Sequence, residues 1–215
     1  MAWRVDLGAR LACAAAIWLA AGAASAADFV APDLSGTSQA PIVAGLPDYS
    51  FRWLQEVRLG VFDHNPVHNE SAPVDVSIEA LSSPITLPGY NNPSIASNPW
   101  INWFFNPRLN IGAMINTEGG TSYAFGGANW RIPIWGPVFF EGEFGGAVNN
   151  GVRHPTYDRV DLGCPVTFRE SGGFGVQLNA NFDVILSVEH ISHLSFCSKH
   201  NPGITDFGVR VGYKF

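Results

Sequence analysis

The sequence predicts an all-β protein, an eight-stranded antiparallel transmembrane β-barrel of the outer-membrane type. Three observations support this fold class. Apolar and polar residues alternate along several segments, charged residues make up only 14% of the chain, and a candidate export signal precedes these segments. Soluble domains contain roughly 25% charged residues, whereas barrel strands alternate between apolar side chains facing lipid and polar side chains facing the lumen.

The first 26 residues have the features of a signal peptide. Arg4 and Arg10 form a basic region, an apolar stretch follows at 11–23, and Ala-Ser-Ala at 24–26 resembles a cleavage site. The apolar stretch is short for a membrane-spanning helix, which needs about 20 apolar residues. We therefore expect residues 1–26 to be removed on export, and an uncleaved anchor is the less favoured alternative.

Eight strand-like segments follow an N-terminal extension, which we assign to residues 27–50 because Pro, Ser and Gly occur there without a clear period. Eight is the smallest common even number of strands for a bacterial outer-membrane barrel. The expected barrel occupies residues 51–215. Its strands are expected at about 51–63, 73–82, 106–117, 121–132, 137–148, 163–178, 182–194 and 204–215.

Alternation assigns an apolar row and a polar row to each strand. In the first strand Val57, Leu59 and Val61 alternate with Glu56 and Arg58. A soluble β-sandwich alternates in the same way, but the last strand favours the barrel. Its apolar row ends on an aromatic residue at the final position, which resembles the assembly signal of outer-membrane barrels. This row consists of Phe207, Val209, Val211, Tyr213 and Phe215.

Charge and motifs exclude several function classes. Without the signal peptide the chain keeps 10 Lys and Arg (12 − 2) and 17 Asp and Glu (18 − 1), a formal charge of −7. This acidity argues against a nucleic-acid partner, which would favour a basic surface. His64 and His68 have a helical metal-site spacing, but Pro66 between them predicts a loop. We find no phosphate-loop, zinc or dinucleotide motif and expect neither a metal nor a cofactor.

The candidate active site lies in the strand at 182–194. On a strand, alternate residues share a face, so His190 and Ser192 continue a row that is otherwise apolar. Residues two apart lie roughly 6.6 Å from each other along the backbone, a gap that an imidazole can bridge. His190 can therefore serve as general base for Ser192. Polar groups on a lipid-facing row are costly and indicate function. The rest of the row is Phe182, Val184, Leu186 and Val188.

Strand pairing suggests further partners. If residues 179–181 form a three-residue turn, the numbers of paired residues sum to about 360, which places Glu170 opposite His190 as a candidate to orient the imidazole. A bulge at the neighbouring glycines would shift this register. The same register places Cys164 opposite residue 196, beside Cys197, so a disulfide is expected between these two cysteines of the exported chain. Two unpaired thiols are the alternative.

The C-terminal segment 189–215 resembles the lipid A 3-O-deacylase family, whose members are eight-stranded outer-membrane acyloxyacyl hydrolases. The likeness is most specific at His-x-Ser, at Asn-Pro-Gly and in the last strand, and segments 56–61, 116–124 and 144–148 are also similar. The resemblance implies that Ser192 is the nucleophile and His190 its base. It also implies that an asparagine in Asn-Pro-Gly helps to hold the oxyanion, and this asparagine is Asn201 here.

Two positions depart from the family pattern. The family has an asparagine directly after the serine, where this chain has His193. It also has a glutamate just after Asn-Pro-Gly, where this chain has Thr205 on the outward row and Asp206 on the inward one. We therefore expect Glu170 to replace the family glutamate. Backbone amides near His193, together with Asn201, are expected to stabilise the oxyanion.

These features predict an outer-membrane esterase that removes an ester-linked 3-hydroxyacyl chain from lipid A of lipopolysaccharide in the outer leaflet. A non-catalytic barrel for envelope integrity or adhesion is the alternative from another class. An acyltransferase barrel is the second enzyme alternative, and it would hide its site in the lumen. The direction in which Ser192 points distinguishes these functions. The sequence leaves open whether the barrel forms a homodimer.

Overall fold

The computed structural model describes residues 51–67, 70, 73–87, 98–154, 156, 159–194, 196–197 and 201–215, without the side chain of Pro99. The predicted signal peptide, the N-terminal extension and His68 lie outside the described residues.

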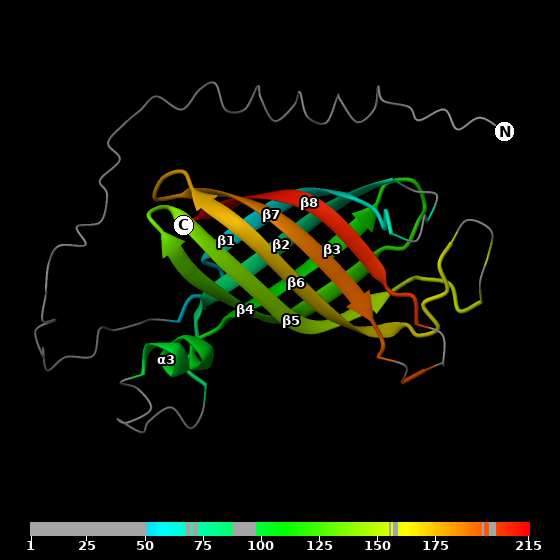
Figure 1. Ribbon diagram of the computed structural model, residues 1–215, viewed down its shortest axis with the longest axis horizontal. Helices are drawn as coiled ribbons and strands as arrows, with labels where there is room; N and C mark the ends of the chain where they lie inside the picture. The colour runs from blue at the N-terminus through cyan, green and yellow to red at the C-terminus, as the bar shows by residue number, and fades with distance from the viewer. Residues whose placement is uncertain are drawn as a thin grey trace, which may run out of the picture. The chain divides into compact units, whose positions relative to one another are not determined.

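Eight antiparallel strands close into a barrel, in which each strand pairs with the next and the last pairs with the first (Figure 1). All eight predicted strands are confirmed, and the largest difference in their boundaries is at the start of the first. The strands are β1 (Glu56–Asp63), β2 (Val74–Pro84), β3 (Arg108–Asn116), β4 (Tyr123–Trp135), β5 (Val138–Asn149), β6 (Val166–Gln177), β7 (Phe182–Ser192) and β8 (Ile204–Lys214).

The predicted rows also hold. Leu59, Ile111 and Leu186 on the outward rows expose 58%, 68% and 64% of their surface, whereas their inward sequence neighbours are buried, apart from the half-buried Gly112. This outward apolar surface suits lipid, because a barrel in a bilayer presents apolar side chains to the acyl chains. In the part of the chain that the structure describes, no helix is long and apolar enough to cross a membrane.

Ion pairs pack the middle of the barrel. The guanidinium of Arg58 lies 2.7 Å from a carboxylate oxygen of Glu141, Arg169 lies 2.6 Å from Glu189, and Arg210 contacts the other oxygen of Glu189. All three arginines are buried. Because a buried charge is costly unless it is paired, this network favours one register of the inward rows.

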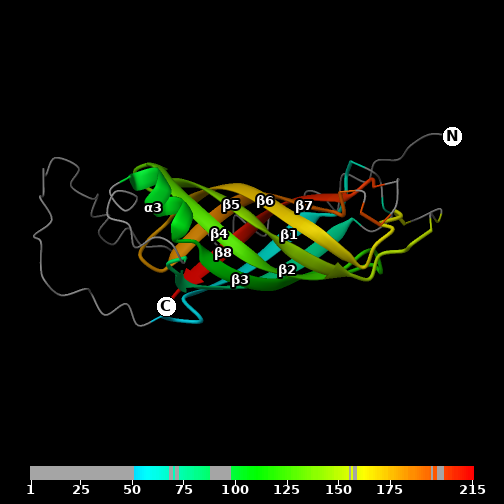
Figure 2. The same cartoon turned by 90° about the horizontal axis from the view of Figure 1, so that it is seen from below.

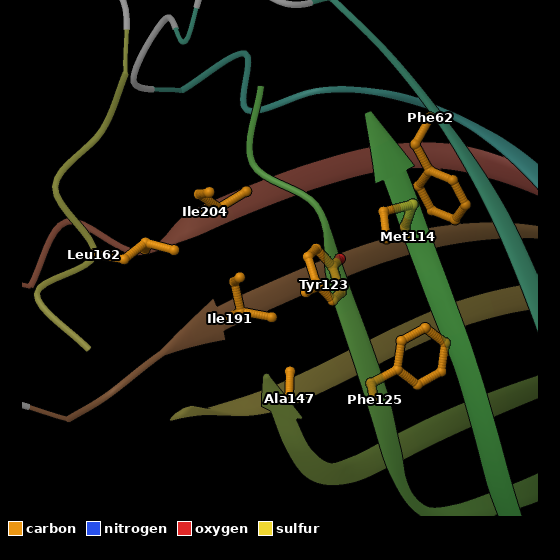
Figure 3. Close-up of a cluster of buried hydrophobic side chains, with 8 residues drawn as sticks. All are labelled: Phe62, Met114, Tyr123, Phe125, Ala147, Leu162, Ile191 and Ile204. Atoms are coloured by element: carbon orange, nitrogen blue, oxygen red, sulfur yellow. The ribbon is translucent and has the colours of Figure 1, made fainter. Parts of the chain in front are cut away.

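A cluster of buried apolar side chains lies at one end of the barrel (Figure 3). We call this end, where β1, β3, β5 and β7 finish, the distal end, and the opposite end the proximal end. The cluster places buried apolar side chains inside this end of the barrel. Its members are Phe62, Met114, Tyr123, Phe125, Ala147, Leu162, Ile191 and Ile204.

A short helix, α3 (Pro99–Phe105), lies between β2 and β3 in sequence and near the proximal end, where the C-terminus also lies (Figures 1 and 2). Its N-cap asparagine accepts hydrogen bonds from two backbone amides of the first turn. Two indole groups fix it to β4: Trp103 donates to the carbonyl of Arg131, and Trp130 donates to the carbonyl of Phe104, both at 2.9 Å.

Candidate active site

His190 and Ser192 lie on the outward row of β7, at the distal end of the strand. The neighbouring inward residues Glu189 and Ile191 are fully buried, whereas Leu186 and Val188 on the outward row are exposed. Ser192 itself exposes only 6% of its surface. It pairs with Phe168 of β6, whose ring lies 5.9 Å from that of Phe196. The serine therefore lies next to aromatic surface on the outer wall and outside the lumen.

The imidazole of His190 is held by Thr205. Nδ1 of the ring lies 2.8 Å from Oγ1 of Thr205, which is the residue that pairs with His190 from β8. This contact leaves Nε2 as the nitrogen that can exchange a proton with a nucleophile. Within the described residues no hydrogen bond joins the ring to the Ser192 hydroxyl. Catalytic hydrogen bonds are often long in a protein without substrate and shorten in the complex.

Glu170 has the position that the pairing arithmetic predicts but not the contact. It pairs with His190 from β6, on the opposite side from Thr205. Nδ1 instead lies within hydrogen-bond distance of Thr205, and within the described residues no hydrogen bond joins Glu170 to the ring. The physical reason is that both neighbouring strands place a side chain next to the histidine, and the ring faces β8. Sequence reasoning missed Thr205 because only a carboxylate was sought.

The glycine of Asn-Pro-Gly lies against the imidazole. Gly203 has φ +66°, and a Cβ atom there would lie 2.6 Å from Cε1 of His190 and 3.0 Å from its Nε2. Any other residue would be strained in this backbone conformation and would also displace the ring. The motif therefore lets the loop before β8 approach the histidine, which the sequence analysis did not foresee.

Asn201 and His193 are engaged with each other. The backbone N–H of His193 donates to Oδ1 of Asn201 at 3.2 Å. This bond fixes the orientation of the amide and leaves the two N–H groups of Nδ2 as donors. The imidazole of His193 is buried and neither of its nitrogens has a hydrogen-bond partner among the described residues. The His193 amide therefore orients Asn201 in this structure and does not itself point at an empty site.

A disulfide joins the loop after β7 to the segment before β6. It links Cys164 to Cys197, with 5.7 Å between the Cα atoms. The bond therefore ties the chain that follows Ser192 to the segment that leads into β6.

A second polar cluster lies at the distal end, around His64 in the loop after β1. Nδ1 of His64 lies 2.7 Å from Asp75, and Nε2 lies 3.1 Å from Glu70. Burial lowers the pKa of this imidazole, but the hydrogen bonds to Asp75 and Glu70 outweigh burial and raise the pKa to about 10. Side-chain atoms of His64, Asp75 and Asp206 lie within 4.8 Å of one another, as in some metal sites. Both ring nitrogens are hydrogen-bonded to carboxylates. The protonated imidazole of His64 therefore supplies the positive charge in this cluster, in the place where a metal site would hold an ion.

An apolar groove of about 650 Å³ lies on the outer wall close to His190. It begins at the cross-strand pair of Val188 and Gly172. This is the next outward pair after His190 and Glu170 in the direction of the proximal end. Gly172 pairs on its other side with Gly142, and an added Cβ at either glycine would meet nothing closer than 3.8 Å. The missing side chains therefore leave a hollow in the outer wall. Its apolar lining residues are Phe140, Phe174, Leu186, Val188, Phe207 and Val209.

A known protein family matches the part of the chain that contains this site. The sequence model of the family described as lipid A 3-O-deacylase (PagL) matches residues 97–214, more than half of the 215-residue chain. This range contains the residues of the candidate active site from Glu170 to Thr205. No curated protein sequence matches the chain.

Solved structures also resemble the barrel, and three of them are a PagL enzyme, a designed barrel and the protein Ail. The crystal structure of the outer membrane enzyme PagL has a TM-score of 0.52 and 13% identity, over 74% of this chain and 99% of that chain. A de novo designed transmembrane β-barrel has a TM-score of 0.44 and 9% identity, over 76% and 97%. The Yersinia pestis outer membrane protein Ail in a phospholipid nanodisc has a TM-score of 0.39 and 12% identity, over 75% and 99%. The first of these likenesses shows the fold of an outer-membrane barrel.

Proposed function

Since this chain belongs to the lipid A 3-O-deacylase (PagL) family, we propose that it is a serine esterase that hydrolyses an ester-linked 3-hydroxyacyl chain of lipid A. Family membership gives the coarser function, a lipid A deacylase of the outer membrane. The arrangement of His190, Ser192 and Thr205 supports the finer part, which is the mechanism and the ester bond.

The reaction follows from the two side chains of β7. Nε2 of His190 takes the proton of the Ser192 hydroxyl as its oxygen attacks the ester carbonyl, because a neutral hydroxyl is a weak nucleophile without a base. The tetrahedral intermediate expels the sugar oxygen, which receives the proton from the imidazolium. Water then attacks the acyl-enzyme with the same histidine as base, and the fatty acid leaves as the serine is restored.

In a conventional triad one carboxylate both orients the histidine and stabilises its positive charge. Here we assign the first role to Thr205 and the second to Glu170. The hydroxyl of Thr205 fixes the orientation of the ring through Nδ1. It carries no charge, so it stabilises an imidazolium less than a carboxylate does. Glu170 lies across the strand pair from His190. Side chains in such a pair are close enough to interact, so Glu170 supplies negative charge beside the imidazolium.

Asn201 supplies the donors for the oxyanion. Its side-chain oxygen is held by the backbone N–H of His193, so Nδ2 is free to donate to a developing negative charge near Ser192. A fixed donor of this kind lowers the barrier more in a site with little water than in bulk solvent. The aromatic residue paired with the serine, Phe168, reduces the access of water.

The apolar groove gives the acyl chain a place on the outer wall. It starts beside His190 and continues along the outward rows towards the middle of the barrel, over Gly172. A lipid in the outer leaflet can place an acyl chain there without leaving the membrane. The carbonyl of the same chain then lies near Ser192.

One observation carries the proposal: His190 lies on the outward row of the barrel, with Nδ1 held by Thr205 and Ser192 next on the same row. An acyltransferase barrel with its site in the lumen would point these side chains inward. A barrel without catalysis would have no need for polar groups on this row.

The test is mass spectrometry of lipid A from a strain with unmodified lipid A that expresses the wild type, Ser192→Ala or His190→Asn. We expect the wild type to remove one hydroxyacyl mass and both variants to leave lipid A intact. Heat-modifiable migration in gels monitors whether each barrel is folded. Unchanged lipid A with a folded wild type, or equal deacylation by Ser192→Ala, would contradict the proposal.

A further inference from the structure

We infer that Asn65, in the loop after β1, is a positioning residue of the active site, which holds Thr205 and through it the His190 ring. This inference rests on the proposed function, because it concerns the geometry of the same catalytic histidine. Asn65 is separated from Thr205 by 140 residues in sequence, and nothing in its own sequence context indicates a role in catalysis.

Asn65 supplies a hydrogen-bond partner at a point where the sheet lacks one. The pairing of β1 with β8 ends at Asp63 and Phe207, so Thr205 lies beyond the last paired residue on that side. The side-chain oxygen of Asn65 accepts from the backbone N–H of Thr205 at 3.3 Å. An unpaired backbone N–H is unfavourable, and here the asparagine takes the place of a strand.

The backbone of Asn65 holds the next residue of β8 as well. Its N–H donates to Oδ1 of Asp206 at 2.9 Å. Asn65 therefore holds two consecutive residues of β8, Thr205 by its backbone N–H and Asp206 by its side chain. Asn65 is fully buried and has φ +40°. Such a conformation is uncommon for any residue but glycine, and asparagine tolerates it better than most.

The charged cluster around His64 keeps this loop in place. His64 is bonded to Asp75 of β2 and to Glu70, and its Nδ1 lies 3.5 Å from Asp206. The second oxygen of Asp206 accepts from the hydroxyl of Tyr123 at 3.1 Å. Asp206 is thus fixed by groups from β4 and from the loop after β1, and the loop is fixed to β2. These bonds connect Thr205, through Asn65 and Asp206, to β2 and β4.

Thr205 needs such support because its side chain is short. A threonine side chain has one rotatable bond to its hydroxyl and is stiff at that bond, so the position of Oγ1 depends on the position of the backbone. A shift of β8 at Thr205 therefore moves Oγ1 relative to Nδ1 of His190, now 2.8 Å apart. Misplacement of a catalytic group by about 1 Å can lower a rate by about 100-fold.

The experiment compares Asn65→Gly with Thr205→Val in a double-mutant cycle, with refolded full-length protein and lipid A in detergent micelles. Glycine accepts the backbone conformation of Asn65 and removes only the side-chain acceptor. Asn179→Gly is the matched control, because Asn179 also accepts backbone hydrogen bonds, from Asn181 and Phe182, but at the proximal end. Heat-modifiable migration reports folding of every variant.

We expect Asn65→Gly to lower kcat by up to about tenfold, no more than Thr205→Val does, with KM changed less than twofold, and Asn179→Gly to match the wild type. The double variant should be no slower than the slower single variant, because both changes release the same ring. Wild-type kcat in folded Asn65→Gly, or multiplicative effects in the double variant, overturns the inference.

Two further comparisons complete the test. Should Asn65→Gly not fold, Asn65→Ser replaces it, because serine is too short to reach Thr205 and the same loss of kcat is expected. Ser192→Ala separates this inference from the proposed function. An inactive Ser192→Ala with a fully active Asn65→Gly overturns the positioning role alone, whereas an active Ser192→Ala overturns the function on which it rests.

Discussion

At the scale of single residues, the proposed active site differs from a conventional triad in the group that holds His190. A hydroxyl takes the place of a carboxylate at Nδ1 of His190, and the nearest carboxylate on the outward row is that of Glu170 across the strand pair. In the proposed mechanism Thr205 therefore orients the imidazole, and the carboxylate of Glu170 lies on the other side of the histidine. The site therefore fixes the orientation of the imidazole without placing a carboxylate directly at Nδ1.

Thr205 provides the first prediction. Thr205→Glu places a carboxylate where the resemblance to the family expects one, and we expect kcat to rise by about tenfold, because hydrogen bonds to charged groups are about twice as strong as neutral ones. Thr205→Val keeps the shape but removes the hydroxyl, and kcat should fall by a similar factor. Initial rates of fatty-acid release from lipid A measure both. A decrease with glutamate, in a folded barrel, would contradict the account of Thr205.

The groove provides the second prediction. Gly172→Leu fills the hollow beside His190 without a backbone clash, since the nearest atom to an added Cβ is Phe140 Cζ at 3.9 Å. We expect KM for lipid A to rise at least fivefold, because the acyl chain loses its apolar contact surface. Gly126→Leu, at another open position on the outer wall, is the control and should leave KM unchanged. Equal KM values for both variants would show that the acyl chain lies elsewhere.

At the scale of elements, the stability of the distal end depends on the charge of His64, which lies in the loop after β1. The pKa of His64 is raised to about 10, so its contribution to stability is complete below the ordinary pKa of about 6.5 and disappears as the pH rises through 10. Glu70 behaves in the opposite sense. Burial raises its pKa, but its hydrogen bonds to His64 and Thr121 outweigh burial and lower the pKa. Its contribution is lost in acid.

The third prediction concerns this pH dependence. The urea concentration at the midpoint of unfolding should fall between pH 7 and pH 10.5 more steeply for the wild type than for His64→Gln, which cannot carry the charge. The comparison between the two proteins removes the titration of other groups. Parallel curves for the two proteins would mean that His64 is not charged in the folded barrel.

The helix α3 provides the fourth prediction. Trp100 and Phe104 expose 67% and 52% of their surface, and aromatic residues favour the interface between lipid and water. We expect Trp100→Cys, labelled with an environment-sensitive dye, to be quenched by brominated lipids in vesicles. Glu118→Cys in the turn after β3 is the control and should not be quenched. Equal quenching at both positions, or none at Trp100, would contradict a position of α3 at the membrane interface.

At the scale of the whole molecule, the barrel was predictable because its signals are local and periodic. Alternation with a period of two residues gives the strands and their faces. The tight turn at 179–181 gives the register that places Glu170 across from His190. The apolar row of the last strand, which contains three aromatic residues, favours a barrel over a sandwich. Each of these signals can be read within a few residues.

The parts that were not predictable depend on contacts between distant segments. The contact of Thr205 with His190 crosses 15 residues, and that of Asn65 with Thr205 crosses 140. Neither has a periodic signal, and a threonine or an asparagine in a loop has many ordinary roles. The helix α3 was missed because its seven residues are nearly all apolar and show no amphipathic period.

The most direct test of the central claim, that Ser192 on the outer wall is a nucleophile activated by His190, is labelling with a fluorophosphonate. The folded protein is treated with the probe and the modified peptide is identified by mass spectrometry. We predict one phosphonate on Ser192 in the wild type, none in Ser192→Ala and a much slower reaction in His190→Asn. A folded wild-type barrel whose Ser192 stays unlabelled, or labelling that is independent of His190, would contradict the account.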